Sequence, residues 1–167
     1  INKLIALDYN LNFLSVAIFA GLLPYLWFNV FSQDKKKIFL GDSGSLFLGY
    51  SIAFLLLYET QVQNNISPPF ALWIIAIPVF DTISVMAYRL NNYQSLFIPD
   101  RNHLHHFLLT LFLSKTKVLL GIIGSGLFLL LIALFLEKYA QPISFHIFLL
   151  FLIFYLWIRV FSKFSKI

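Results

Sequence analysis

The stretch VLLGIIGSGLFLLLIALFL, residues 118–136, decides the fold because it is apolar except for one serine and carries no charge. A run of about 20 such residues is long enough to cross the hydrocarbon core of a bilayer as a helix. Other apolar stretches of similar character are Leu11–Phe31, Ser45–Tyr58, Phe70–Tyr88 and Ile143–Val160. The sequence therefore predicts an all-α, polytopic transmembrane helix bundle with about five spans.

The composition agrees with a lipid-embedded chain and excludes several other classes. Of the 167 residues, 60% are hydrophobic and 11% are charged, whereas soluble domains carry roughly 25% charged residues. Cysteine is absent from the sequence, which excludes disulfide frameworks, thiolate nucleophiles and Cys-based metal sites. The net charge of +5 does not indicate a nucleic-acid partner, because in a membrane chain the positions of the cations matter more than their sum.

The positions of the basic residues predict the orientation of the spans. Ten of the twelve Lys and Arg residues fall on one side of the predicted bundle: Lys35, Lys36, Lys37, Arg89, Arg101, Lys115, Lys117, Arg159, Lys163 and Lys166. Only Lys3 and Lys138 fall on the other side. Since Lys and Arg mark cytoplasmic loops, we expect the N-terminus outside and the C-terminus in the cytoplasm.

The start of the chain differs from a signal peptide. It begins with Ile1, and no basic segment followed by an apolar core is found there. We therefore expect that the N-terminal part of a longer protein is missing. The longest polar segment, Arg89–Lys117, is predicted to be functional, because long polar loops are rare in so hydrophobic a chain.

The first candidate motif is the Gly-Asp-Ser-Gly turn at residues 41–44, which follows three lysines and Phe39. Glycines beside an acid let the backbone approach a ligand closely, and amides that open a helix can receive phosphate. The carboxylate of Asp42 is a hard oxygen ligand suited to Mg²⁺ shared with substrate phosphates. The alternative is that Asp42 or Ser43 only caps the following helix.

The second candidate is the segment Asp100–His106, which holds three of the four histidines. Histidine binds phosphate as imidazolium, donates hydrogen bonds or ligates metals, and Arg101 offers a planar fork for a diphosphate. The spacing is poor for zinc, since a helical pair of ligands is separated by four residues. The alternative is an exposed polar loop with chance histidines, while His146 lies alone on an apolar stretch and is predicted to be structural.

The third candidate is Asp81, a carboxylate within a predicted span. An acid at bilayer depth costs on the order of 3 kcal/mol, so its default interpretation is functional. Asp81 precedes Arg89 by eight residues, which places it roughly 12 Å from the cytoplasmic end. A buried hydrogen bond to a neighbouring helix is the alternative.

Together these motifs resemble a known family. Residues 38–45 are similar to its F-(M/L)-G-D-(S/T/A)-G-S motif, residues 78–89 to its P-x-x-D-T span, and residues 99–106 to its P-D-R-N-H-L-H-H loop. The family is bacterial glycosyltransferase family 4, the polyprenyl-phosphate N-acetylhexosamine-1-phosphate transferases. The resemblance covers essentially the whole chain and implies a phosphoglycosyl transferase in the bacterial inner membrane with its active site facing the cytoplasm.

The resemblance also implies a reaction. Undecaprenyl phosphate attacks the β-phosphorus of a UDP-N-acetylhexosamine, UMP leaves, and a lipid-linked hexosamine remains to start a cell-envelope glycan. Catalysis would then depend mainly on positioning and on neutralisation of charge. Mg²⁺, or Mn²⁺ in its place, would hold the diphosphate. The Arg-Asn-His-Leu-His-His form favours UDP-GlcNAc over a peptide-bearing substrate.

The resemblance assigns roles residue by residue. Asp42 matches the metal-binding acid, and the catalytic set comprises Asp42, His103, His105 and His106. Phe39 matches an aromatic that packs on uracil. The remaining substrate-binding positions are Gly41, Ser43, Gly44, Arg101, Asn102 and Asp81.

The chain departs from the family in length. Members have about twice as many spans, and their N-terminal half carries an adjacent Asp pair, which this chain lacks. Residues 1–167 are therefore interpreted as the C-terminal part of one integral-membrane transferase domain. We expect the 167 residues alone to be inactive.

Two other functions stay open at this point. One is a non-catalytic membrane module or transporter fragment, in which Asp81 would mark an ion path. The other is an anionic-lipid surface formed by the basic loops, which would leave the histidines unexplained. A homo-oligomer also stays open, since a lipid-facing apolar stripe could pair with a copy of itself.

Overall fold

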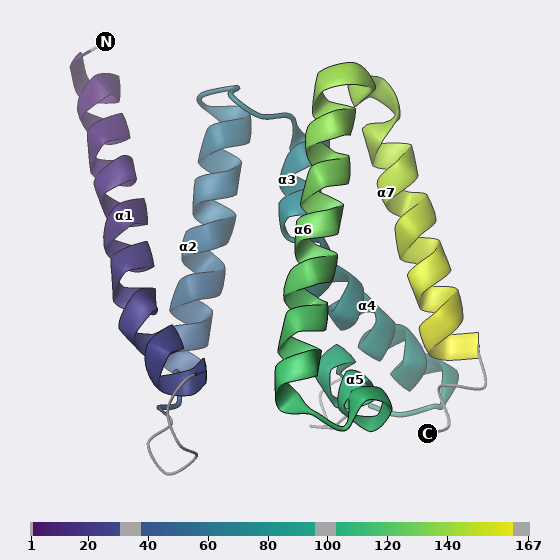
Figure 1. The fold of residues 1–167 in the computed structure, drawn as a ribbon. Helices are drawn as coiled ribbons and strands as arrows, with labels where there is room; N and C mark the ends of the chain where they lie inside the picture. The colour runs from purple at the N-terminus through teal and green to yellow at the C-terminus, as the bar shows by residue number, and fades with distance from the viewer. Residues whose placement is uncertain (1, 31–37, 96–102, 162–167) are drawn as a thin grey trace. The chain divides into compact units, whose positions relative to one another are not determined.

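A computed structural model gives the structure, and it describes residues 2–30, 38–95 and 103–161. Every regular element in these ranges is a helix and none is a strand, so the all-α prediction is confirmed (Figure 1). The chain divides into two compact units, Ile1–Gln63 and Asn64–Ile167. Each unit is described by itself below.

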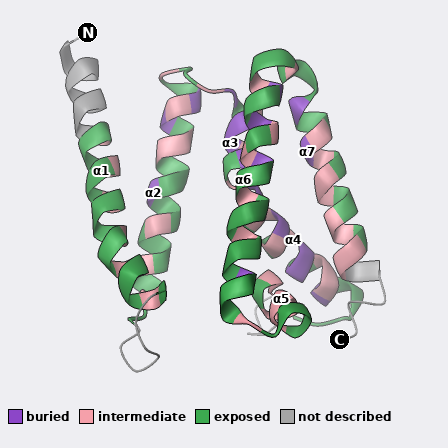
Figure 2. Ribbon diagram, viewed as in Figure 1, coloured by how far each residue is buried: buried purple, intermediate pink, exposed green. Residues whose placement is uncertain are grey.

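The first unit consists of two long helices, α1 (Asn2–Val30) and α2 (Gly41–Gln61). No described side chain of α1 is buried, and α2 buries only Ser51, Tyr58 and Thr60 (Figure 2). An apolar groove between the two helices is lined by Phe19, Leu22 and Leu55 among others. Apolar side chains on these helices therefore lie mostly on the surface of the unit.

Within its described residues, the second unit contains five α-helices and a short π-helix. They are α3 (Pro68–Ile74), α4 (Ala76–Asn91), α5 (Leu104–Phe112), α6 (Lys115–Tyr139), α7 (Gln141–Leu156) and η2 (Trp157–Phe161). Helices α6 and α7 form a hairpin against which α3 and α4 pack (Figure 1). Helix α5 lies at the end of the unit where α6 begins, and we call this the histidine end.

A sharp bend separates α3 from α4. Taken together, the two helices are long and apolar enough to cross a membrane, but their axes are inclined to each other by 76° at Ile75. Pro78 explains the break, because it has no amide hydrogen for the carbonyl of Ile74 and its ring clashes with that carbonyl. A single continuous helix over Phe70–Tyr88 is therefore a wrong prediction, and the stretch is a broken span or a re-entrant segment.

Three described helices are long and apolar enough to cross a membrane: Leu11–Val30, Lys115–Tyr139 and Gln141–Arg159. The bent pair α3–α4 would make a fourth. The expected span Ser45–Tyr58 is helical within α2 but is not among them, since serines, glycines and an acidic residue at each end dilute its apolar character. Five spans and the orientation of the termini stay predictions.

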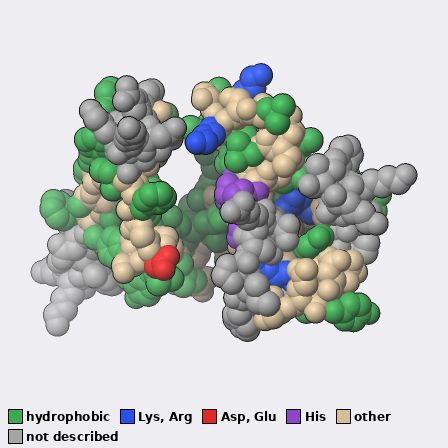
Figure 3. Space-filling view, turned by 90° about the horizontal axis from the view of Figure 1, so that it is seen from below, with side chains coloured by type: hydrophobic (Ala, Val, Ile, Leu, Met, Phe, Trp, Pro, Cys, Tyr) green, Lys and Arg blue, Asp and Glu red, His purple; other side chains and the backbone are tan. Residues whose placement is uncertain are grey.

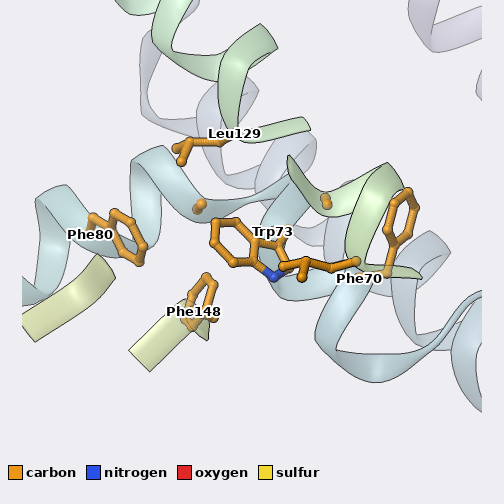
Figure 4. Packing of buried hydrophobic residues seen from close by; sticks show 8 residues of the cluster. Phe70, Trp73, Phe80, Leu129 and Phe148 are labelled. Atoms are coloured by element: carbon orange, nitrogen blue, oxygen red, sulfur yellow. The ribbon is translucent and has the colours of Figure 1, made fainter. Parts of the chain in front are cut away.

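The core of the second unit is aromatic. Trp73 of α3 is 2% exposed and packs edge-to-face on Phe148 of α7, with ring centroids 5.3 Å apart (Figure 4). Phe80 of α4 lies 5.0 Å from the same Phe148 ring. The Trp73 indole N–H donates to the Ser144 hydroxyl at 3.1 Å, so its one polar atom is satisfied within the core. These contacts fix α3, α4 and α7 to one another.

A carboxylate links the C-terminal end of α6 to the N-terminal end of α3. Glu137 of α6 accepts the backbone N–H of Ser67 at 2.9 Å and also the Ser67 hydroxyl. Ser67 is the N-cap of α3, and its hydroxyl oxygen in turn accepts the Phe70 amide at 3.3 Å. The start of α3 is therefore capped by its own serine and by an acid 70 positions away in the sequence.

The Trp73–Ser144 pair gives a first testable prediction. Replacing Ser144 by alanine leaves the buried indole N–H without an acceptor, and we expect a loss of about 1 kcal/mol in the free energy of unfolding. Denaturant unfolding in detergent micelles measures it. The control is Ser125→Ala, since the exposed Ser125 hydroxyl bonds only to the backbone of its own helix. Equal stability of the two variants would contradict the prediction.

Candidate active site

The start of α5 is held by Asp81 of α4. One carboxylate oxygen accepts the backbone N–H of Leu104 at 2.7 Å, and the other lies 3.1 Å from Nδ1 of His103. His103 is the N-cap residue of α5, and its own side chain makes no cap hydrogen bond. Asp81 therefore does the work of an N-cap from a different helix, where a negative charge is also favoured by the helix dipole.

Asp81 is itself fixed by its surroundings. Its side chain is 18% exposed, against 44% for His103. The buried Ser84 donates its hydroxyl to the backbone carbonyl of Asp81 at 2.8 Å. Bonds to a charged acceptor are stronger than neutral ones and strengthen further away from water. Asp81 thus makes hydrogen bonds to a neighbouring helix, as the alternative predicted, but they are only partly buried. Its contact with substrate stays a prediction.

The three histidines of this segment form a cluster on the first turn of α5. The rings of His103 and His105 are nearly parallel with centroids 6.1 Å apart, and those of His105 and His106 are 4.2 Å apart. We call these three residues the histidine cluster. It lies at the histidine end, with Lys and Arg side chains on the same face (Figure 3). Three histidines that lie within four positions of the sequence are thus brought together at the start of one helix.

The cluster affects the protonation of its exposed middle member. Partial burial lowers the pKa of His105 below its usual value, and the neighbouring rings of His106 and His103 lower it further. The charge of Asp81 acts in the opposite direction but is the smallest cause. The lowered pKa favours the neutral imidazole of His105, which can donate from one ring nitrogen and accept at the other.

The Gly-Asp-Ser-Gly turn opens α2 in the first unit. Gly41 has φ +71°, a conformation that favours glycine, and it is the first residue of the helix. The N-cap position is Leu40, with no side-chain cap bond, so the alternative that Asp42 or Ser43 caps α2 is wrong. Phe39 is 92% exposed, Asp42 is exposed, and no described group pairs with the Asp42 carboxylate.

The two units divide the predicted site residues between them. The second unit brings together Asp81, His103, His105 and His106. The first unit holds Phe39, Gly41, Asp42, Ser43 and Gly44 on one turn. Arg101 and Asn102 lie outside the described residues.

Two residues near the cluster were not predicted as part of the site. Phe107 of α5 lies under the guanidinium of Arg159, with 4.8 Å between the Arg159 Cζ and the ring centroid. In the sequence, Arg159 was a marker of the cytoplasmic side and Phe107 one apolar residue among many. The spacing from His103 to Phe107 was the one available signal, since residues four apart share a helix face.

The donor set limits how a metal could bind. No group of three or more His, Asp or Glu side chains within the described ranges could hold an ion. A single exposed carboxylate such as Asp42 still fits Mg²⁺, which keeps several waters and shares its coordination with substrate phosphates. The residues present therefore suit a cation that arrives with a diphosphate.

The geometry defines a class of protein: an all-helical chain with membrane-length apolar helices, a carboxylate on a glycine-bounded helix start, and a histidine cluster anchored by a second acid. Residues 3–60 of the chain match the family described as glycosyl transferase family 4. The family resemblance inferred from the motifs is thereby confirmed for part of the chain.

Named relatives extend the similarity. An undecaprenyl-phosphate alpha-N-acetylglucosaminyl 1-phosphate transferase of Salmonella typhi is 43% identical over 95 residues, which is 56% of this chain and 26% of the relative. The protein of the same name in Pasteurella multocida is 39% identical over 131 residues, or 69% of this chain and 36% of the relative. The matched segments thus span 26% and 36% of the length of these two relatives. No solved structure shows a significant match.

The contact of Asp81 with the start of α5 gives a second prediction. In Asp81→Asn the amide can no longer accept from both His103 and Leu104, and its NH₂ can donate to Nδ1 instead. We expect His103 to change from the tautomer protonated at Nδ1 to a mixture of both tautomers. ¹⁵N spectroscopy of ring-labelled histidine measures this change.

Glu137→Gln is the matched control for Asp81→Asn. It weakens the corresponding acid cap of α3, about 30 Å away along α6 at about 1.5 Å per residue. The His103 spectrum is expected to stay unchanged in this variant. An unchanged spectrum in Asp81→Asn as well would show that Asp81 does not fix the ring.

The lowered pKa of His105 gives a third prediction. Between the lowered value and the usual value near 6.5, the unfolded chain binds more protons than the folded chain. The free energy of unfolding is therefore expected to rise with pH through this window and to fall on acidification. His105→Gln is expected to flatten the slope, whereas His146→Gln, outside the cluster, keeps it. The measurement is the free energy of unfolding from pH 5 to pH 7.5. The prediction is wrong if its slope against pH is the same in both variants as in the unchanged chain.

Proposed function

We propose that this chain is the C-terminal part of a membrane phosphoglycosyl transferase. The enzyme transfers N-acetylglucosamine 1-phosphate from UDP-GlcNAc to undecaprenyl phosphate and so starts a lipid-linked cell-envelope glycan. The observation that carries the proposal is the histidine cluster, which Asp81 anchors at the start of α5. The names of relatives at about 40% identity support the same acceptor and sugar.

The reaction exchanges one phosphoanhydride for another. A phosphate oxygen of undecaprenyl phosphate attacks the β-phosphorus of UDP-GlcNAc and forms a new P–O bond. The bond between the β-phosphorus and the bridging oxygen breaks, and UMP leaves with that oxygen. Because no net charge is created and the two bonds are similar, the protein has mainly to align the reactants and to spread the developing charge.

The histidine cluster suits the charge-stabilising role. Because the Asp81 carboxylate can only accept, the Nδ1 of His103 carries the hydrogen of their contact, and Nε2 is left to bind a ligand. The neutral His105 and the adjacent His106 add hydrogen-bonding groups on the same turn. Preorganised donors of this kind lower the barrier because they need no rearrangement during the reaction.

The turn at residues 41–44 suits the nucleotide-sugar side of the reaction. Asp42 would hold Mg²⁺, which neutralises the diphosphate when bound. Gly41 allows the left-handed φ of +71°, and Gly44 leaves room for Leu40, whose Cγ would lie 2.8 Å from a Cβ at that position. The exposed Phe39 ring is free to stack on a base. Arg101 and Asn102 are proposed to hold the diphosphate or the sugar.

The proposed setting is the bacterial inner membrane, with the bilayer as a partner and the active site facing the cytoplasm. Soluble UDP-sugar would then arrive from the cytoplasm, and the polyprenyl chain would stay in lipid. The transporter alternative gains little support, because Asp81, the acid that would mark an ion path, is used to hold α5.

The decisive variant is Asp42→Asn. The assay protein is a chimera in which this chain replaces the matching segment of the Pasteurella multocida relative. The relative supplies the rest of the length. We expect release of UMP from UDP-GlcNAc, with polyprenyl phosphate and Mg²⁺ present, to fall about 100-fold or more, since charge stabilisation of this kind is commonly worth that much. The 167-residue chain by itself is expected to release none.

Glu59→Gln, at the other end of α2, serves as the control and is expected to keep the activity. Undiminished activity of Asp42→Asn with normal membrane insertion would remove Asp42 as the metal ligand. An inactive parent chimera that nevertheless inserts and folds would count against the transferase function and in favour of a non-catalytic module.

A further inference from the structure

The end of α7 carries an arginine that the proposed chemistry does not use. Helix α7 passes at Trp157 into the five-residue π-helix η2, which contains Arg159. π-helical turns are rare and are found mostly at functional sites, because the wider turn changes the direction of the side chains after it. Arg159 is half-buried, unlike a cation that only marks one side of a membrane.

The Arg159 side chain contacts α5 directly. Its Cζ lies 4.8 Å from the centroid of the Phe107 ring, which is within the range of a cation–π interaction. Phe107 follows His103 by four residues, and its amide donates to the His103 carbonyl at 3.2 Å. Both residues therefore lie on the same face of α5, one turn apart.

Helix α5 needs such contacts because burial does not fix it. None of its residues is buried, although it is nine residues long and strongly apolar. A two-residue connection, Leu113 and Ser114, joins it to α6, with Leu113 in a left-handed conformation at φ 51°. The Asp81 carboxylate fixes only the first turn. Helix α5 also packs against α6, and a contact one turn later adds a second fixed point that can set the rotation of the helix.

Tyr155 places the Arg159 region next to Asp81. Its ring lies 5.8 Å from Phe80 of α4, and its hydroxyl is buried. The hydroxyl is within electrostatic range of both Asp81 and Arg159. Helix η2 also packs against α4. The acid and the arginine that contact α5 therefore come from two helices that are themselves packed together.

We propose that Arg159 is a positioning residue for the histidine cluster: its guanidinium, stacked on Phe107, sets the rotation of α5. Together with Asp81 it determines the directions of His105 and His106. The role is a property of the folded chain and does not depend on which reaction the cluster serves.

Hydrogen exchange of the 167-residue chain in lipid nanodiscs tests this role. Arg159→Gln removes the cation, and Phe107→Leu removes the ring while leaving the charge in place. We expect both variants to speed amide exchange in α5 about 3- to 10-fold, with the core residues of α6 and α7 unchanged. The ring ¹⁵N signals of His105 and His106 are expected to shift in both. Phe107→Tyr, which keeps a π-face, is expected to restore the wild-type behaviour.

Lys138→Gln is the matched control, since the Lys138 ammonium lies 5.0 Å over the Tyr139 ring at the opposite end of α6. It is expected to leave α5 exchange and the histidine signals unchanged. The proposal is overturned if Phe107→Leu leaves both readouts at the level of Lys138→Gln, or if exchange rises equally throughout the second unit. Neither readout uses transferase activity, so failure of the proposed function would not affect the result.

Discussion

The first amides of a helix have no partner within the helix, and acceptors from other parts of the protein can satisfy them. In the second unit two helix starts are satisfied by carboxylates from other helices. Asp81 of α4 accepts from the start of α5, and Glu137 of α6 accepts from the N-cap of α3. The other oxygen of Asp81 contacts His103, so the carboxylate that satisfies the start of α5 also orients the candidate site.

The bend between α3 and α4 makes the Asp81 contact part of the fold. Pro78 breaks the segment at Ile75, and α4 leaves at 76° to α3. Trp73 and Phe80, one on each side of the break, both pack on Phe148. The aromatic core thus fixes the direction of α4, and Asp81 follows Phe80 directly. A site residue at this position inherits the rigidity of the core, which supports precise orientation of the histidine cluster.

Hydropathy and motif spacing were sufficient for the coarse architecture, because both are local. They located the long apolar helices, the acid-containing turn at residues 41–44 and the clustering of the three histidines. They missed the apolar helix α5, which lies within the segment Arg89–Lys117 that was predicted to be a polar loop. The contacts that orient the site depend on pairs distant in the sequence, such as Asp81 with His103 and Arg159 with Phe107. Neither pair has a local pattern in the sequence. The bend between α3 and α4 could not be predicted from Pro78 alone, because lipid-buried helices often tolerate a proline.

Asp42 and Asp81 have the same side chain but different physical situations. Both oxygens of Asp81 already accept hydrogen bonds from α5, so ligation of a cation there would release the helix that carries the histidines. Asp42 is exposed on a glycine-bounded turn and has no described partner, so its oxygens can ligate at no cost to the fold. The proposed division of roles follows from this difference. In the proposed enzyme, Asp81 would maintain a preformed surface for charge, while Asp42 would supply a ligand to the cation that arrives with the diphosphate.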